Sequence, residues 1–366
     1  MKKDISFTKP RILHIAPANI SGVPGQFVQT EQQLGYDSRL VTLFPDPRHY
    51  FSDICLNLPF IDFAPTKWMK RLVSDPKKLV VHNRAPQPES IPIVWQAHSF
   101  FEQVLVDARD RLWQPKIQRA IAHYHLDEFD VYQLDGGLGL YRRAAFILEM
   151  KARGKKIISC YTGSDLRTRG VIKEIDDIAD LNVTVEYDHL RLHPNIRHVF
   201  FPFDASRFAL HEHHDNAKPV RIGHAPTNRG AKGSDIIIPI LQELAQKYNV
   251  EIELIEGLPY REALARKSRC DIFVDQIGDL GYGINSLEAM AMGIPAASCV
   301  APGFAAMYPE HALVEVDAAT LAAKLAPLIH DAALRRRIGE RGRTWVLENH
   351  DAVQVVQKIH AFAGIA

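Results

Sequence analysis

The sequence has few cysteines and almost no net charge. Its four cysteines, at positions 55, 160, 270 and 299, form no CxxC pair, which argues against a zinc ribbon, a redox motif or a disulfide framework. We therefore expect reduced and mostly buried thiols in a cytoplasmic protein. Because 44 basic residues balance 43 acidic ones, no global field attracts nucleic acid, and we expect no nucleic-acid partner.

Long hydrophobic runs are also absent. No window approaches the roughly 20 apolar residues that a membrane-spanning helix requires, and the N-terminal MKKDISFTKP lacks the apolar stretch of a signal peptide. Hydrophobic residues make up 46% of the 366 residues and charged residues 24%, which is typical of a globular protein with room for two domains. We expect a cytoplasmic protein that at most lies on the inner surface of a membrane.

Signatures of several enzyme classes are missing. There is no GxGxxG fingerprint, which argues against a dinucleotide-dependent dehydrogenase. Neither a GxSxG elbow nor a Cys–His nucleophile signature occurs. No DxD pair is available to hold Mg²⁺ or Mn²⁺, and the HEHH run at 211–214 lacks the spacing of a metal site, so we interpret it as a polar linker. We expect neither a metal nor a cofactor.

Short apolar runs alternate with helix-period segments along most of the chain, which predicts parallel sheets covered by helices. Before position 201 we expect strands at 11–18, 38–44, 130–135 and 155–163, and helices at 25–35 and 139–153. After position 218 we expect strands at 219–225, 250–257, 270–277, 295–300 and 312–317, and helices at 234–248, 260–268 and 285–292. The proline-broken region 45–115 allows no assignment.

The break in this alternation divides the chain. We expect a first domain over 1–203, a linker over 204–218 and a second domain over 219–350, both of the doubly wound α/β class. In open sheets of this class, ligands bind beyond the carboxyl ends of the strands. With two such domains facing each other, we expect the site in the cleft between them.

The segment 278–295, GDLGYGINSLEAMAMGIP, carries the most information. Gly281 and Gly283 predict a tight turn from a strand into a helix, whose free N–H groups and positive dipole end favour a phosphate. Glu288 is the only charged residue over 280–309, and if it is buried it needs hydrogen-bond donors such as ribose hydroxyls. The alternative is that Glu288 lies on a solvated helix face.

This segment resembles the donor-site signature of GT-B glycosyltransferases of family 4, E-G-(F/Y)-G-x-x-x-L-E-A-M-A-x-G-x-P. The matching positions are Gly281, Tyr282, Gly283, Leu287, Glu288, Ala289, Met290, Ala291, Gly293 and Pro295. The resemblance implies that Glu288 holds the ribose and that the turn faces the diphosphate and sugar. It makes donor-binding candidates of Gly281, Tyr282, Gly283, Ile284, Asn285, Ser286, Leu287 and Glu288. Leu280 stands where the family has a glutamate that contacts the donor sugar, and Asp279 is its nearest substitute.

A second segment, RIGHAPTNRGAKGSD at 221–235, resembles the family's strand–loop segment in which an arginine and a lysine clamp the diphosphate. Arg229 and Lys232 fit these roles, because fixed cations stabilise the charge that accumulates on a leaving diphosphate. His224 and Asn228 lie in the same segment and are further donor-binding candidates. The alternative is a basic surface turn.

The resemblance is specific over about 200–350, where 200–208 and 339–351 also match, and it is diffuse over 1–200. It implies a GT-B fold of two Rossmann-like domains facing across a cleft, with the C-terminal helix, 351–366, returning to the first domain. It also implies a retaining reaction in which the leaving diphosphate helps to deprotonate the acceptor.

Three loops of the first domain follow predicted strands. The resemblance implies a glycine-rich loop near the donor phosphates after the first strand, where Gly22 and Gly25 allow close backbone approach. The alternative is a plain turn. Asp135, Asp165 and Arg167 are our catalytic candidates for orienting the acceptor or the reacting sugar. The alternative for the aspartates is helix capping.

The segment 64–84 contains six basic residues and one acidic residue, a net charge of +5, interleaved with Trp68 and other apolar residues. Such a segment can dock on an anionic membrane or a lipid-phosphate acceptor. A solvated basic flap is the alternative.

We interpret the chain as a hexosyltransferase-like glycosyltransferase that moves a sugar from a nucleoside-diphosphate sugar to a hydroxyl of a glycan, glycolipid or small molecule. The alternatives are a sugar-nucleotide epimerase or hydrolase, and a non-catalytic sugar-nucleotide-binding protein, on the same fold. A dehydrogenase ranks below these.

Overall fold

The computed structural model describes residues 9–46, 50–59, 92–97, 100–212, 218–278 and 281–365. The chain forms two compact units: Met1–Phe200 with Val355–Ala366 (unit 1), and Phe201–Gln354 (unit 2). The basic segment 64–84, the pair Asp279 and Leu280, and part of the HEHH run lie outside the described residues.

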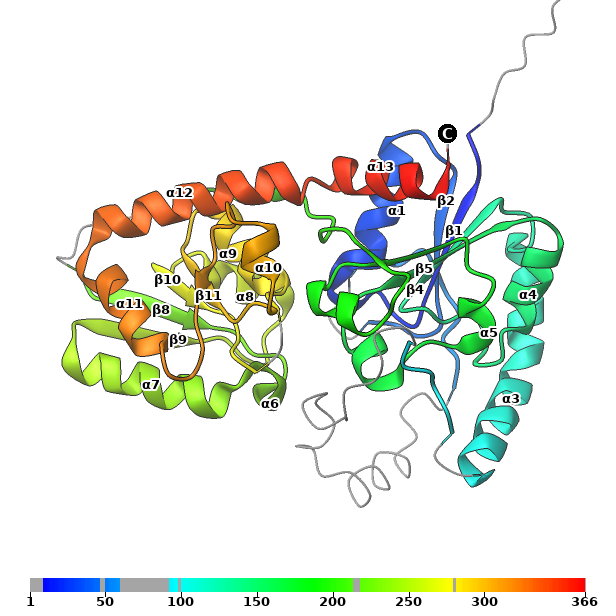
Figure 1. Cartoon of the computed structure of the whole chain (residues 1–366), viewed down its shortest axis with the longest axis horizontal. Helices are drawn as coiled ribbons and strands as arrows, with labels where there is room; N and C mark the ends of the chain where they lie inside the picture. The colour runs from blue at the N-terminus through cyan, green and yellow to red at the C-terminus, as the bar shows by residue number, and fades with distance from the viewer. Residues whose placement is uncertain are drawn as a thin grey trace, which may run out of the picture. The chain divides into compact units, whose positions relative to one another are not determined.

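Unit 1 is built on a parallel sheet of seven strands in the order β3-β2-β1-β4-β5-β6-β7. Figure 1 labels β1, β2, β4 and β5 of this sheet. The strands are β1 (Ile12–Ala16), β2 (Ser38–Thr42), β3 (Ile54–Cys55), β4 (Val131–Asp135), β5 (Lys156–Tyr161), β6 (Leu181–Thr184) and β7 (Arg197–His198). Where unit 1 is described, its helices and helical turns are η1 (Ile20–Gly22), α1 (Val23–Gln33), α3 (Phe100–Tyr124), α4 (Ala145–Ala152), η4 (Asp165–Arg169), α5 (Lys173–Asp176), η5 (Tyr187–Arg191) and most of α13 (Ala352–Ala363). The order reverses between β1 and β4, which is the switch point where doubly wound sheets bind ligands.

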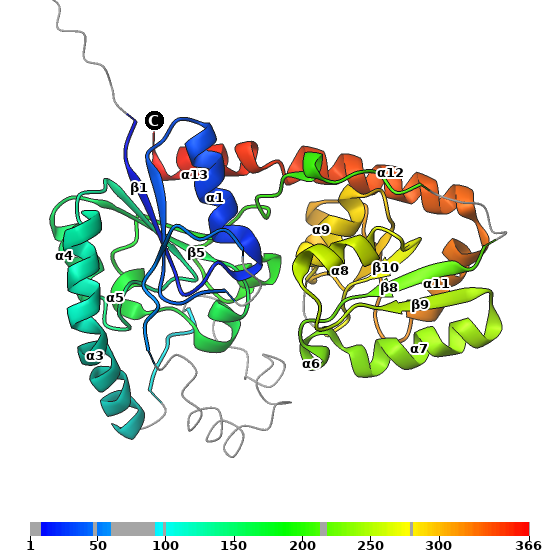
Figure 2. The same ribbon diagram turned by 180° about the vertical axis from the view of Figure 1, so that it is seen from behind.

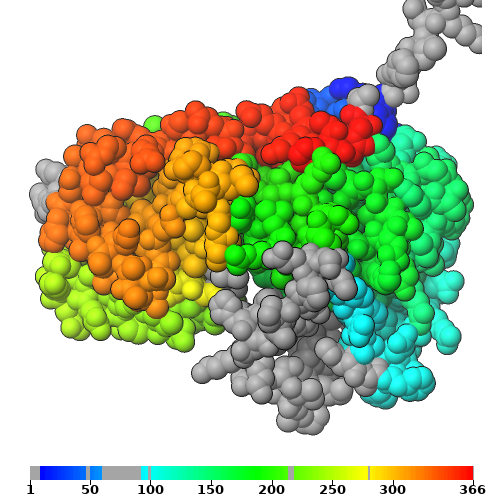
Figure 3. All heavy atoms as spheres, in the orientation of Figure 1, coloured from blue at the N-terminus to red at the C-terminus, as the bar shows by residue number. Residues whose placement is uncertain are grey.

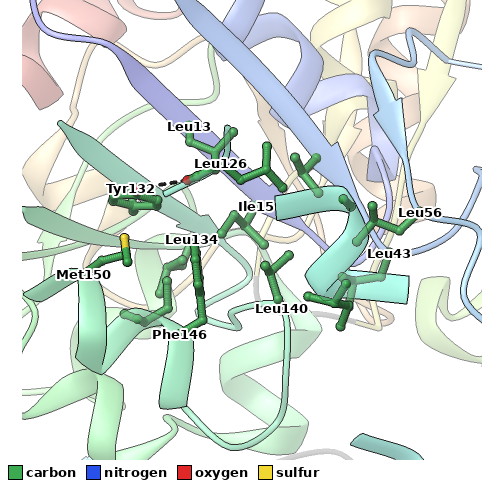
Figure 4. Close-up of a cluster of buried hydrophobic side chains, with 14 of the residues drawn as sticks. Leu13, Ile15, Leu43, Leu56, Leu126, Tyr132, Leu134, Leu140, Phe146 and Met150 are labelled. Atoms are coloured by element: carbon green, nitrogen blue, oxygen red, sulfur yellow. Dashed lines mark hydrogen bonds between the residues drawn. The ribbon is translucent and has the colours of Figure 1, made fainter. Parts of the chain in front are cut away.

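One face of this sheet carries the apolar core of unit 1. Because side chains alternate along a strand, Leu13 and Ile15 of β1 point to the same face, as do Tyr132 and Leu134 of β4. These residues pack with Trp113 and other residues of α3 and with residues of α4. Figure 4 shows this core, in which the Tyr132 hydroxyl donates a hydrogen bond of 2.9 Å to the carbonyl of Leu126.

The opposite face of the same strands is buried but polar. His14 of β1 and Asp135 of β4 alternate with the apolar residues and are almost fully buried. Helix α1 and the last part of α13 lie beside each other over this face (Figures 1 and 2), and Nε2 of His360 is 2.9 Å from Oε1 of Glu31. The space-filling view shows the end of the chain, in red, against blue and green atoms of unit 1 (Figure 3). The C-terminal helix thus completes the first unit, as the sequence resemblance implied.

Unit 2 is built on a parallel sheet of five strands in the order β12-β11-β10-β8-β9. The strands are β8 (Val220–His224), β9 (Val250–Leu254), β10 (Ile272–Val274), β11 (Ala296–Ser298) and β12 (Val314–Glu315). The helices are η6 (Ala205–Arg207), α6 (Arg229–Lys232), α7 (Ser234–Lys247), α8 (Tyr260–Lys267), α9 (Ile284–Ala291), α10 (Phe304–Met307), α11 (Leu321–His330) and α12 (Ala332–Asn349). The switch point of this sheet lies between β8 and β10.

Helix α9 is held close to α12 by glycine. A Cβ atom added to Gly339 of α12 would lie 1.8 Å from the carbonyl oxygen of Gly293, which follows α9. Any larger residue at position 339 would push the two helices apart, so this glycine fixes the depth at which α9 sits in unit 2.

Each of the nine strands expected from the sequence is present, and all the strand pairs are parallel. The helix expected at 139–153 is shorter than predicted and begins at Ala145, because a glycine-containing loop follows β4. The four cysteines are free, and Cys160 and Cys270 are buried. Among the described residues no helix is long and apolar enough to cross a bilayer.

Candidate functional site

The loop after β8 and the short helix α6 lie at the switch point of unit 2. Asn228 caps α6, because its side-chain oxygen accepts a hydrogen bond of 3.2 Å from the N–H of Ala231. Gly278 follows β10 and approaches α6 so closely that an added Cβ atom would lie 2.4 Å from the carbonyl oxygen of Ala231. This contact fixes α6, which carries Arg229 and Lys232, beside the carboxyl end of β10.

Lys232 lies at the amino end of α9. Its Nζ is 2.7 Å from Oδ1 of the fully buried Asp275, which directly follows β10. Oδ2 of Asp275 accepts hydrogen bonds from the N–H of Gly283, at 3.0 Å, and from the Ser286 hydroxyl, at 2.7 Å. Burial alone would raise the pKa of Asp275, but the Lys232 ammonium and these donors lower it below its ordinary value. A carboxylate therefore occupies part of the helix terminus, while the N–H groups of Ile284 and Asn285 in the first turn lack intrahelical acceptors.

Glu288 is buried in the second turn of α9, with 4% of its surface exposed, so the interpretation that it lies on a solvated helix face is wrong. Its Oε2 pairs with the ammonium of Lys267, a residue at the end of α8 that is itself only 2% exposed. Lys267 also donates a hydrogen bond of 2.6 Å to the side-chain oxygen of Asn285. Asn285 in turn donates from Nδ2 to the carbonyl of Ala225, at 3.0 Å, and so ties α9 to the loop after β8.

Arg229 is the exposed cation of this region. Its guanidinium forms a bidentate pair with Glu256, with Nε and Nη2 2.8 and 2.6 Å from the two carboxylate oxygens. This pairing raises the pKa of Arg229 and lowers that of Glu256. Because 59% of the Arg229 side chain is exposed, the guanidinium can turn to another anion with little loss.

His224 ends β8 and is fully buried. Its Nδ1 is 2.8 Å from the carbonyl oxygen of Val274, so Nδ1 carries the proton, and its Nε2 accepts from the Ser234 hydroxyl at 2.8 Å. Burial lowers the pKa of His224, which keeps the ring neutral. Its partners lie in the sheet and in α7, so it stabilises the base of the loop.

The remaining donor-binding candidates of unit 2 separate into two groups. Ile284, Asn285 and Ser286 form the first turn of α9 beside Lys232. Tyr282, in contrast, is buried in an aromatic cluster with Phe304 and Trp345, and its hydroxyl lies 3.2 Å from His350. Leu287 is fully buried in the core, and the carbonyl of Gly281 accepts a hydrogen bond from Gln276.

The candidates of the first domain all belong to unit 1. Gly22, with φ of +75°, precedes α1, and Gly25 in the first turn donates its N–H to Asn19 at 2.9 Å. Asp165 accepts hydrogen bonds from the N–H groups of Thr162, Gly163 and Leu166, which hold the loop before η4. The N-cap residue of η4 is Ser164, which makes no side-chain capping bond. The guanidinium of Arg167 is paired with Glu186 and Asp188.

Asp135 lies in a buried charged network. Its Oδ2 is 2.9 Å from Nδ1 of His14, and Nε2 of His14 is 2.9 Å from Oε2 of Glu31. Burial opposes a charge on His14, yet the two carboxylates raise its pKa to about 10, so both ring nitrogens donate. The pKa of Glu31 is lowered to about 2, because His14 and His360 outweigh the effect of burial.

Asp275 and Lys267, the two partners that hold Lys232 and Glu288, were not predicted from the sequence. Asp275 could have been found from the sequence, because it directly follows the apolar run of a predicted strand and lies three residues before Gly278. No sequence feature marked Lys267 as buried, since a lysine late in an amphipathic helix is normally exposed.

The arrangement in unit 2 can bind an anion. The ammonium of Lys232 and the first turn of α9 converge at the carboxyl edge of the sheet, and Arg229 lies on the same short helix. Among the described residues no three or more His, Cys, Asp or Glu side chains are grouped to hold a metal ion.

Residues 240–345, which include Lys267 and α9, match the family model of glycosyl transferases group 1. Among solved structures, the chain is similar to sucrose-phosphate synthase from Thermosynechococcus elongatus, with a TM-score of 0.58 and 13% identity over 96% of this chain and 98% of that one. It is similar to TarM, with a TM-score of 0.57 and 10% identity over 98% and 99% of the two chains. The chain has the GT-B fold.

A third GT-B structure, the lipopolysaccharide outer core galactosyltransferase WaaB in its apo form, gives a TM-score of 0.54 and 12% identity over 97% of this chain and 99% of that one. None of the curated proteins matches the chain. The GT-B fold expected from the sequence is therefore confirmed, and the family match together with this fold supports glycosyl transfer.

Proposed function

We propose that the chain is a glycosyltransferase that moves a sugar, a hexose in our proposal, from a nucleoside-diphosphate donor to a hydroxyl acceptor with retention of anomeric configuration. The observation that carries this proposal is the placement of Lys232 at the amino end of α9, at the switch point of a GT-B domain. Helix α9 lies within the residues that match glycosyl transferases group 1.

In this proposal the diphosphate binds the free N–H groups of Ile284 and Asn285. Lys232 turns from Asp275 toward the phosphates, and Arg229 exchanges Glu256 for the same ligand. Asp275 keeps its two hydrogen bonds at Oδ2, but its Oδ1 loses the ammonium, so this exchange offsets part of the free energy gained from the new contacts to phosphate. The oxygen of Glu288 that does not bind Lys267 accepts a hydrogen bond from the ribose.

The proposed transfer reaction places negative charge on the leaving diphosphate. The acceptor oxygen bonds to the anomeric carbon, the bond from that carbon to the diphosphate oxygen breaks, and the acceptor proton passes to the departing diphosphate. Lys232 and Arg229 stabilise the negative charge that grows on the leaving group. Because these cations neutralise it, the proposal requires no metal.

The test is binding of UDP, GDP, ADP and dTDP sugars, measured by thermal shift and calorimetry on the wild type and on Lys232→Ala. We expect one nucleotide class to stabilise the wild type, and Lys232→Ala to bind it at least about tenfold more weakly, because a charge-assisted contact to phosphate is lost. Lys247→Ala, at the exposed end of α7, is the matched control. Unchanged binding by Lys232→Ala would refute this placement of the diphosphate.

Product analysis separates transfer from the alternatives on this fold. A transferase incubated with donor alone releases little free sugar, whereas a hydrolase releases it and an epimerase changes the donor itself. A sugar-nucleotide-binding protein gives no product with any acceptor pool.

A further inference from the structure

Unit 1 contains an arginine whose hydrogen bonds are not satisfied. Arg142 lies in the loop that follows β4, at the switch point of the first sheet. Its Nε and Nη1 atoms are buried and have no hydrogen-bond partner within the described part of the chain. The guanidinium stacks 5.0 Å from the ring centre of Trp95, and the residue as a whole is half-buried.

A second arginine at the same edge of the sheet also lacks a carboxylate partner. Arg169 follows β5 and donates from Nε to the carbonyl of Gly170 at 3.0 Å and from Nη2 to the carbonyl of Gly136. Among the described residues no ion pair is formed by either Arg142 or Arg169. Burial, together with the neighbouring charges of Arg169 and Arg109, lowers the pKa of Arg142 to about 10.

The nearby carboxylates are already engaged. Asp110 pairs with Arg109 at 2.8 Å and accepts the N–H of Arg143. Asp165 accepts three backbone N–H groups. Glu102 favours the charged form of Arg142 electrostatically, but it forms no hydrogen bond with the buried Nε or Nη1.

Leaving a guanidinium in this state costs free energy, because buried N–H donors without acceptors forfeit their hydrogen bonds to water. A chain that gains nothing from such a side chain would be more stable with an apolar residue there. Arginine at this position therefore points to a ligand with oxygen acceptors and negative charge, for which the planar guanidinium is suited.

We propose that Arg142 and Arg169 form an anion-binding subsite of unit 1 that takes a phosphate group, and that the acceptor of the transferase carries this group. The second half of this statement rests on the proposed function, whereas the first does not. Inorganic phosphate and a sugar phosphate carry the same phosphate group, and the experiment below distinguishes between them.

The experiment measures thermal stability and calorimetric binding of inorganic phosphate at constant ionic strength, in the wild type and in Arg142→Met. Methionine retains the contact with Trp95 but carries no charge and no donor. We expect Arg142→Met to melt about 2–4 °C above the wild type without phosphate, and to bind phosphate at least about tenfold more weakly. The rise in stability is a result that a purely structural role for Arg142 does not give.

The neighbouring Arg143 supplies the matched control. It is exposed and paired with Asp107, so Arg143→Met should leave phosphate binding unchanged. If Arg142→Met binds phosphate as tightly as the wild type, the proposed subsite is refuted. A lower melting temperature of Arg142→Met together with unchanged phosphate affinity would show that Arg142 has a structural role only.

A second arm identifies the source of the phosphate and keeps the two proposals apart. A hexose phosphate that binds more tightly than inorganic phosphate, with both lost in Arg142→Met, supports an acceptor phosphate. Equal affinity for both overturns that half and leaves only a phosphate ion site. We expect Arg142→Met and the wild type to bind nucleotide equally well. If the wild type binds no nucleotide, the donor proposal fails. The phosphate measurement still tests the subsite in that case.

Discussion

Both sheets begin with a strand that carries a fully buried histidine, and the two histidines are in opposite protonation states. His14 in β1 lies between the carboxylates of Asp135 and Glu31, and its pKa is raised to about 10. His224 at the end of β8 lies between a carbonyl and a hydroxyl, and its pKa is lowered.

Burial is equally complete for the two rings, so the partners make the difference. Desolvation disfavours the charged imidazole in both units, and only two close carboxylates outweigh it. The same residue type thus serves as a buried cation in unit 1 and as a neutral hydrogen-bonding bridge in unit 2.

The strongest test of this contrast replaces each histidine by leucine. His14→Leu leaves two buried carboxylates without their cation, and we expect it to lower the free energy of unfolding of unit 1 by about 3–5 kcal/mol. His224→Leu removes two neutral hydrogen bonds, and we expect a loss of about 1–3 kcal/mol. Urea unfolding followed by circular dichroism measures both. Equal losses in the two variants would contradict a charged His14 and a neutral His224.

The pH dependence of stability sharpens the same comparison, because the two histidines act in opposite directions. The folded pKa of His14 is raised, so its contribution is complete below the ordinary pKa of 6.5 and is lost as the pH rises through about 10. The folded pKa of His224 is lowered, so its contribution is complete above pH 6.5 and is lost as the pH falls below that value.

We therefore expect His14→Gln to flatten the alkaline limb of the stability curve between pH 6.5 and 10, and His224→Gln to flatten the limb below pH 6.5. Urea midpoints measured across this range for the wild type and both variants give the result. An alkaline limb that persists unchanged in His14→Gln would show that His14 is neutral in the folded protein.

The smallest effect concerns an exposed charge pair. Arg229→Ala breaks its pair with Glu256, and because the arginine is exposed we expect no measurable shift in the urea midpoint of unit 2. In the same variant we expect weaker nucleotide binding, measured by calorimetry. A clear loss of stability without a loss of binding would assign Arg229 to the fold and remove it from the donor site.

Nine strands of the two sheets could be predicted from the sequence, because buried parallel strands are short apolar runs bounded by turns, as 270–277 illustrates. Strands β3, β6 and β7 were not predicted, and β3 and β7 are only two residues long. The position of α9 was equally clear from its glycine-rich turn. Helix α3 was not predicted, since Phe100 and Leu112 remain exposed and Pro115 lies inside the helix, which hides its apolar periodicity.

The candidate site was predictable in its location but not in its pairing. The sequence places Lys232 and α9 at strand ends, and the structure brings them together. The partners of Glu288 and Glu31 could not be predicted, because no local pattern marks a contact such as that between Glu31 and His360, which are 329 positions apart. The roles proposed for Asp135, Asp165 and Arg167 stay predictions.

The contact between His360 and Glu31 also bears on synthesis at the ribosome. Unit 2 ends at Gln354, whereas unit 1 needs Val355 and the residues after it. The first unit, which begins the described chain, therefore cannot complete its fold before Val355 and the residues after it have been synthesised. Until then Glu31 must accept hydrogen bonds from water or from a donor other than His360.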